Sequence, residues 1–330
     1  MSNLQLIKPG NILSIPEEDE ILEDSPNRQF MVANTVPILL DEMKRDHIIP
    51  VYVKDNEPLI SHTDFIDVAE EVVWENYNGE YILKPIVRVS HPIKGRVPEA
   101  RNKPANELND WEKTIYYERM AFIIEIPSIS TDIDGNSLSL TIGGVKSYNQ
   151  DNLYSKKGSN EHFKVFIGFK NQVCTNLCIW TDGFMDSIEV ASIGMLKACI
   201  QNLIERYNVN YQILQMGMLR NHSLTEHQFA TLIGKCRMYG HLPQQIKNGI
   251  PQLHLVDTQI ATVCKDYYKD NSFCRDNNGN INLWKLYNLL TGANKSSYID
   301  NFLDRGVNAY HFVEAIRFGL ENKQANWFLD

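Results

Sequence analysis

Three runs of alternating apolar residues between residues 114 and 183 constrain the fold of this 330-residue chain more than any other feature. They read TIYYERMAFIIEIP, SLSLTIGGVKSYN and HFKVFIGFKNQVCTNLCIW. Successive side chains of a strand point to opposite faces, so each run predicts a β-strand with one core-facing side. Asp134-Gly135, between the first two runs, is a strong signal for a tight hairpin turn. We expect an antiparallel sheet, in which Gly143-Gly144 indicates a bulge or a close approach to the backbone.

The third run has two unlike faces. One carries only large apolar side chains and predicts a core face: Phe163, Val165, Ile167 and Phe169. The other places two lysines around an aromatic ring and a glycine: Lys164, Phe166, Gly168 and Lys170. We expect this second face to remain exposed and basic. The alternative is that helices cover the ring of Phe166 while the lysine stems extend to water.

Before residue 114, the sequence predicts helices and extended segments in alternation. A short helix is expected over 36–47 and a strand over 47–54. A longer helix begins after Thr63 as its N-cap and stops at Gly79. The segment 81–93 is extended, and its two prolines favour an edge position. Residues 93–113 lack a period and predict a long basic loop, which at such a length is functional or mobile.

Beyond residue 183 the hydrophobic period becomes helical. An apolar stripe runs from Ile193 to Tyr207, and Thr225 with Gln228 forms a capping box ahead of another helix. Two final helices are expected on either side of Gly306.

The fold class that follows is α+β, with an antiparallel β-rich N-terminal half and a helical C-terminal layer. We predict an acidic mobile tail over 1–30, a β-rich domain with two helices over 31–183, and a helical domain packed on it over 184–330.

Charge is distributed unevenly along the chain. The net charge is −9, yet residues 84–103 hold six basic residues against one acidic residue, and residues 141–180 hold five against two. Lysines can follow phosphates, and a base can stack on an exposed ring. We therefore predict that nucleic acid binds to one aromatic and ten basic residues, namely Lys164, Phe166, Lys170, Lys146, Lys156, Lys157, Arg88, Lys94, Arg96, Arg101 and Lys103.

Motifs for catalysis or metal binding do not reach their required spacing. In DIDGNS the glycine, Gly135, stands at position four where a calcium loop needs it at six, so a hairpin turn is the better interpretation. Cys174 and Cys178 have no second pair at zinc-ligand spacing. The sequence therefore predicts no cofactor. A carboxylate site for metal-assisted hydrolysis is an open alternative, drawn from Glu118, Glu125, Asp132, Asp134 and Asp182.

The start of the chain has no apolar leader, and no segment approaches the roughly 20 apolar residues of a membrane helix. We expect a cytoplasmic protein that does not enter a membrane. Its six cysteines are then expected to be reduced.

Several blocks of sequence carry a resemblance to a known family. The segments PIVRVSHPIKGRVPEARNKPANEL, TIYYERMAFIIEIPSI, LTIGGVKSYNQDNLYSKK, FKVFIGFKNQVCTNLC and LWKLYNLLTGANKSSYIDNFLDR resemble the bacterial family named domain of unknown function 3871. More distantly, FIGFKNQVCTN and LWKLYNLLT are similar to the phage and plasmid-like family named domain of unknown function 932. The shared positions there are Cys174-Thr175-Asn176 and Tyr287-Asn288, whereas Leu177 replaces a frequent glycine. The resemblance implies a setting in mobile elements and supplies no catalytic residues.

These observations favour a non-enzymatic, sequence-independent nucleic-acid-binding protein of a phage, plasmid or conjugative transposon, acting on single-stranded DNA in recombination or replication. Two alternatives stay open. One is a metal-dependent nuclease or hydrolase. The other is a protein-interaction component, such as a homo-oligomer or an inhibitor of host defence with a host protein as its partner.

Overall fold

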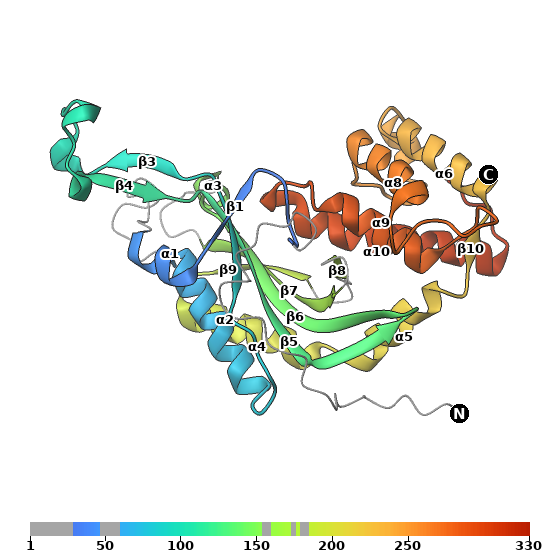
Figure 1. Cartoon of the computed structure of the whole chain (residues 1–330), viewed down its shortest axis with the longest axis horizontal. Coiled ribbons are helices and arrows are strands. Elements are labelled where there is room, and N and C mark those ends of the chain that lie inside the picture. The colour runs from blue at the N-terminus through green and yellow to red at the C-terminus, as the bar shows by residue number, and fades with distance from the viewer. Residues whose placement is uncertain (1–28, 47–59, 154–159, 173–175, 179–184) are drawn as a thin grey trace.

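A twisted antiparallel sheet of seven strands organises the molecule (Figure 1). The computed structural model describes residues 29–46, 60–153, 160–172, 176–178 and 185–330. The strand order is β1-β2-β5-β6-β7-β8, and β9 pairs with β7 beside β8. The predicted α+β class is confirmed, since strands fill the N-terminal half and helices the C-terminal half. The predicted strand over 47–54 lies outside the described residues.

The strands of the main sheet are β1 (Thr35–Ile38), β2 (Ile86–Ser90), β5 (Arg119–Ile133), β6 (Asn136–Ser147), β7 (Glu161–Asn171), β8 (Leu177–Cys178) and β9 (Met185–Val190). Four shorter strands form two separate ribbons, β3 (Ile93–Arg96) with β4 (Lys113–Tyr116) and β10 (Ser223–Leu224) with β11 (Ile281–Asn282). The helices are α1 (Leu40–Asp46), α2 (His62–Asn76), α3 (Tyr148–Leu153), α4 (Ile193–Arg206), α5 (Val209–Leu219), α6 (Glu226–Tyr239), α7 (Gln244–Lys247), α8 (Asp257–Lys269), α9 (Leu283–Asn294) and α10 (Ile299–Asn322).

The β5–β6 hairpin confirms the turn prediction. Asp134 and Gly135 both have positive φ, 55° and 76°, as a two-residue turn matched to the strand twist requires. The Gly135 amide donates to Asp132 Oδ1 at 3.0 Å, which holds the turn from within.

Close packing explains the predicted Gly143-Gly144 pair in β6. A Cβ built on Gly143 would lie 2.2 Å from the carbonyl oxygen of Phe122 and 2.8 Å from the ring of Phe166. A Cβ on Gly144 would lie 2.4 Å from the ring of Phe65. Neither site has room for a side chain, so the prediction of close approach is confirmed.

One face of the sheet forms the large core with α2 and α4. Phe65 of α2 meets Phe122 of β5 and Phe163 of β7 edge-on, with ring centroids 5.0 and 4.8 Å apart. The predicted core residues of the third run, Phe163, Val165, Ile167 and Phe169, are all buried there. Helix α2 begins two residues earlier than predicted, because Ser61 is its N-cap and forms a reciprocal capping box with Asp64, so Thr63 lies inside the helix.

The other face of the sheet packs against α10. Phe302 and Leu303 of this helix join Phe30 and Met31 in a second buried cluster. Phe30 therefore belongs to the core, although the sequence pattern placed it at the end of a mobile tail. Helix α10 continues through Gly306, so the prediction of two helices divided there is wrong. Gly306 is buried, and tertiary packing outweighs a propensity cost of about 1 kcal/mol relative to alanine.

Helix signals in the C-terminal half are confirmed elsewhere. The predicted stripe of α4 buries Leu196, Ile200, Leu203 and Ile204. Thr225 and Gln228 form the predicted capping box of α6.

Two predictions about the N-terminal strands need correction. Residues 81–93 do not form an edge strand, since β2 lies between β1 and β5, and the edge position belongs to β1 with Pro37. The two prolines of that segment, Pro85 and Pro92, lie just outside β2 and so remove no ladder hydrogen bond. The long basic loop over 93–113 is instead folded into the β3–β4 ribbon and its tip, which extend away from the sheet (Figure 1).

Candidate nucleic-acid interface

The face of β7 that was expected to be exposed is covered. Phe166 is only 2% exposed and lies with Phe302 and Leu303 in the cluster under α10. The prediction of an exposed ring is therefore wrong. Burying a phenylalanine ring is favourable by roughly 1.5–3 kcal/mol, and Gly143 leaves the space that the ring fills.

The lysines beside Phe166 hold carboxylates of the protein itself. Lys164 Nζ donates to Asp304 Oδ2 at 2.7 Å and to the carbonyl oxygen of Asp300 at 3.1 Å. Lys170 is buried and pairs with Glu125, which also accepts from Ser139. Burial alone raises the pKa of Glu125, but the charge and hydrogen bond of Lys170, together with hydrogen bonds from Ser139 and Gln172, outweigh it and hold that pKa below its ordinary value. This face is therefore covered at Phe166 and Lys170, and both of its lysines are paired with carboxylates.

Two more predicted residues serve the core of the sheet. Lys146 is fully buried on the opposite face, where it pairs with Glu161 at 2.7 Å and lies 3.9 Å from the ring centroid of Phe163. Arg88 is buried in β2 and donates to the backbone and side chain of Thr35. Lys156 and Lys157 lie outside the described residues.

The remaining four predicted residues come together on a projecting ribbon, here called the arm (residues 93–116). It carries Lys94, Arg96, Arg101 and Lys103. In the antiparallel register Lys94 lies opposite Ile115, and Arg96 lies opposite Lys113. Opposed residues of a ladder share a face. One face of the arm therefore gathers three cations, including Lys113, which the sequence reasoning did not select.

Short 3-10 turns build the tip of the arm, at Pro98–Ala100, Ala105–Glu107 and Asp110–Glu112. Glu112 is buried there, accepting from Lys103 Nζ at 2.9 Å and from the Asn109 amide at 2.6 Å. These two donors, with Lys103 the larger influence, hold the pKa of Glu112 below its ordinary value. Arg96 donates to the carbonyl oxygen of Lys103. Lys103 thus fixes the tip and does not point freely to solvent.

Trp111 stands out at this tip because its side chain is 70% exposed. Tryptophan is usually buried through most of its surface, so an exposed ring at the end of a projection is informative. It is two residues from Lys113, whose Nζ lies 2.7 Å from Asp110 Oδ1. The signal in the sequence was a lone tryptophan in the polar segment NDWEK.

The charge of the arm differs in sign from that of the chain. Five basic residues (Lys94, Arg96, Arg101, Lys103, Lys113) against four acidic residues (Glu99, Glu107, Asp110, Glu112) give +1, whereas the whole chain carries −9. Lys103 and Lys113 are ion-paired. Within the part of the chain that the structure describes, no carboxylate lies in ion-pair distance of Lys94, Arg96 or Arg101.

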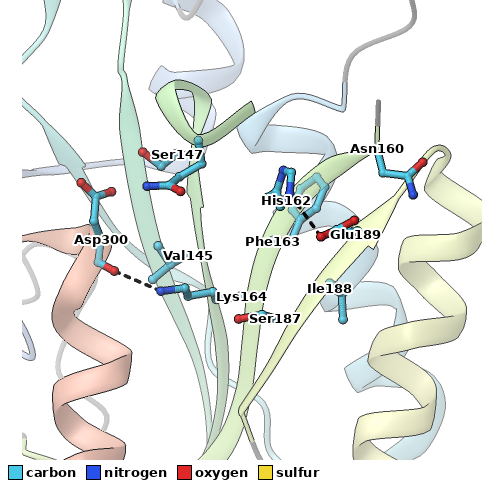
Figure 2. Close-up of a pocket in the computed structure, with 11 residues that line it drawn as sticks. Val145, Ser147, Asn160, His162, Phe163, Lys164, Ser187, Ile188, Glu189 and Asp300 are labelled. Carbon is cyan, nitrogen blue, oxygen red and sulfur yellow. Dashed lines mark hydrogen bonds and ion pairs between the residues drawn. The ribbon is translucent and has the colours of Figure 1, made fainter. Parts of the chain in front are cut away.

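An open cavity of about 600 Å³ lies over β6, β7 and β9. We call it the hollow, and its polar lining consists of Ser147, Gln150, Asn160, His162, Lys164, Ser187, Glu189 and Asp300. Figure 2 shows Lys164 and Asp300 meeting on one side and His162 facing Glu189 on the other. Strands β6, β7 and β9 supply the floor, and the first turn of α10 supplies one wall.

Asp300 forms one side of the hollow, across from His162. Its Oδ2 accepts from Arg119 Nε at 2.6 Å. Its Oδ1 is buried, and no described residue donates a hydrogen bond to it. Across the hollow, His162 Nε2 lies 3.4 Å from Glu189 Oε1.

Three of the five carboxylates considered for metal-assisted hydrolysis have separate structural partners. Glu125 pairs with Lys170, Asp132 accepts from the turn amide of Gly135, and Asp134 accepts from Asn282. Asp182 lies outside the described residues. Among the residues that the structure describes, no three His, Cys, Asp or Glu side chains lie close enough together to hold a metal ion.

The fold and the arm define an α+β protein with a projecting β-ribbon. The chain belongs to the family described as "Domain of unknown function, B. Theta Gene description" (DUF3871), whose model matches residues 17–329. No curated protein and no solved structure matches the chain. None of the helices in the described ranges is both long enough and apolar enough to cross a membrane.

Proposed function

We propose that this protein binds nucleic acid without sequence preference, that it uses the arm to do so, and that single strands are its preferred ligand. The observation that carries the proposal is the 70% exposed ring of Trp111 at the tip of a ribbon with three cations on one face. The proposed site is therefore the arm and not the buried face of β7. Of the residues predicted from the sequence, it includes Lys94, Arg96 and Arg101.

Each part of the arm supplies a recognised contribution to single-strand binding. An unpaired base stacking on an exposed aromatic ring contributes about 1–3 kcal/mol and tolerates any base. Lys94, Arg96 and Lys113 on one face are placed to follow successive phosphates. Each neutralised phosphate releases counterions, so binding weakens steeply with salt. Neither contribution depends on the sequence of bases.

The role is non-enzymatic in this proposal, and its setting is a mobile element. The setting rests on the likeness of Cys174-Thr175-Asn176 and Tyr287-Asn288 to the phage and plasmid-like family DUF932. Binding of single strands by the arm fits recombination or replication, where single strands are exposed.

A fluorescence anisotropy titration with a labelled oligothymidine tests the arm. Replacing Trp111 with alanine should weaken binding about 5- to 150-fold, the equivalent of 1–3 kcal/mol. The matched control is Trp74→Ala, since Trp74 is also exposed, at 53%, but lies on α2. That control should bind as the wild type does.

The salt dependence of the same titration tests the cations. Each phosphate contact to a single strand contributes about −0.7 to the slope of log K against log salt, so K94A/R96A should flatten the slope by about 1.4. Absence of binding at low salt, or arm variants that bind like the wild type, would contradict the proposal.

A further inference from the structure

We infer that Arg305 and Tyr298, at the start of α10, form a second nucleotide-binding site, in which the guanidinium group holds a phosphate and the ring stacks on a base. In the setting of the proposed function, on which this inference rests in part, both groups contact the strand that the arm binds. A free nucleotide offers the same phosphate and base, so strand and nucleotide are tested separately.

Arg305 is a half-buried cation without a counter-charge. Its Nη1 donates to Ser297 Oγ at 2.9 Å, and in the described ranges no carboxylate lies within ion-pair distance of it. Burial lowers the pKa of Arg305, since its charge is partly removed from water. A guanidinium group has several N–H donors in a planar fork, so most of them are left for a ligand. An anion that accepts from this fork would offset the cost of the desolvated charge.

Buried side chains hold the guanidinium group in place. Ser297 Oγ also accepts from Gln259 Nε2 at 2.8 Å and donates to Asn294 Oδ1 at 2.7 Å. Ser297, Gln259 and Asn294 are at most 2% exposed. A hydroxyl group has one donor and two acceptor positions, so Ser297 is fully used and serves only to orient Arg305. A charged group fixed by such a supporting shell is ready for its ligand before binding.

Tyr298 supplies an exposed ring on the same side of α10. Its side chain is 61% exposed, and it is the N-cap of the helix. Arg305 follows it by about two helical turns, or roughly 10 Å, so both side chains lie along one face. Asn301, between them on this face, is exposed and neutral. The face thus presents a ring, an amide and a cation in a row, which are groups that bind a base and a phosphate.

The first turn of α10 lies at the root of the arm. Arg119 comes shortly after the end of β4, and its Nε donates to Asp300 Oδ2 at 2.6 Å. Asp300 is close to Tyr298 in the chain. A strand that follows the arm to its root therefore comes near Tyr298 next.

An anisotropy titration with labelled oligothymidine over a range of salt concentrations tests the cation. Arg305→Ala should weaken binding about tenfold or more, and it should flatten the slope of log K against log salt by about 0.7, the share of one phosphate contact. Arg305→Gln keeps an amide that can donate to Ser297, and should flatten the slope equally without loosening the fold. The matched control is Arg220→Ala, an exposed arginine at the end of α5, which should bind as the wild type does.

The ring is tested in the same titration. Tyr298→Ala should weaken binding about 5- to 150-fold and leave the salt slope unchanged, because stacking releases no counterions. The matched control is Tyr211→Ala on α5, where the side chain is 46% exposed. That control should bind as the wild type does.

Calorimetric titrations with thymidine 5′-monophosphate and with thymidine separate the two sources of phosphate. A loss with R305Q for both oligothymidine and the monophosphate supports a site for nucleotides in general, and a loss for oligothymidine alone supports a site for a strand. Variants R305Q and Y298A that bind both ligands like the wild type would overturn the inference. So would polyglutamate that binds through Arg305 where oligothymidine does not, since the site would then fit an acidic protein.

Failure of this site and failure of the arm give different results. If only the arm is wrong, R305Q and Y298A weaken oligothymidine binding and W111A leaves it unchanged. If only the site on α10 is wrong, binding depends on Trp111 and the two α10 variants bind like the wild type.

Discussion

Lys146 and Lys170 lie on opposite faces of the sheet, and each faces a carboxylate on its own face. Lys146 pairs with Glu161, and Lys170 pairs with Glu125. A lysine in an alternating strand suggests exposure to water, because a charge is seldom buried. Here the cost is offset by partners that come from other strands, 15 and 45 residues away in sequence. Sequence spacing alone does not reveal such partners.

Removing Glu125 should therefore expose the cost of a buried charge. Glu125→Gln leaves the ammonium group of Lys170 without its counter-charge, and breaking a buried pair in this way costs about 3–5 kcal/mol of unfolding free energy. Urea denaturation at pH 7 measures this. The control is Asp257→Asn, which breaks the pair with Arg237; both side chains are exposed, at 60% and 59%, so water screens this pair and its loss should leave the unfolding free energy nearly unchanged.

The Glu125–Lys170 pair also predicts that the unfolding free energy depends on pH. Because the pKa of Glu125 is lowered in the folded protein, its ionised form stabilises the fold above the unfolded pKa of about 4.3, and this stabilisation is lost as pH falls through the folded pKa. The gap in unfolding free energy between wild type and E125Q should be constant from pH 7 to about 5 and shrink below about 4.3. A gap that widens in acid would contradict the assigned pair.

At the scale of elements, the sequence correctly predicted those turns, caps and helices whose cause lies within a few neighbouring residues. The Asp134-Gly135 turn, the Thr225 capping box and the apolar stripe of α4 each have a short-range cause. The arm had no such signal. Its strands, IKGR and KTIY, are four residues long and contain no buried residue, and their ladder follows the one between β2 and β5.

The candidate sites likewise contain some residues that sequence patterns could predict and others that only the folded structure brings together. Basic windows in the sequence led to the cations of the arm, but Trp111 was left out because exposure depends on the tip's fold. The hollow could not be predicted, since Ser147, Lys164 and Asp300 meet only through strand register and the docking of α10. Phe166 was misassigned because alternation shows which face a residue is on and not what covers that face.

Replacing either of two glycines by alanine should change stability in opposite directions, because one is closely packed and the other has open space around it. Gly143→Ala would place its Cβ 2.2 Å from the Phe122 carbonyl oxygen, and we expect this overpacking to cost about 1–3 kcal/mol or more. Gly217→Ala in α5 meets no atom within 4 Å and should stabilise by about 0.4–1 kcal/mol. Denaturation midpoints check both signs. Equal effects would mean that backbone freedom, and not the close approach, decides the first site.

At the scale of the molecule, the sheet joins two cores. The larger cluster contains Phe65 and Phe163 from the β-rich half together with Leu196, Val263 and Trp284 from the helical half. The smaller one fixes α10 and Phe30 on the other face. A core shared in this way favours unfolding as one unit, whereas the division into 31–183 and 184–330 predicted from the sequence allows two.

Phe302 tests that cooperativity, because it packs on the sheet far along the chain from the strands it covers. Phe302→Ala, at a site 3% exposed, should cost about 3–5 kcal/mol. The control is Phe318→Ala in the same helix, at 53% exposure, where a surface change stays within about 0.5 kcal/mol. Helix content by circular dichroism and tryptophan fluorescence, to which fully buried Trp284 in α9 contributes, should shift together to the same lower midpoint. If helix signal were lost first while the fluorescence kept its wild-type midpoint, α10 would unfold separately and the shared core would not govern stability.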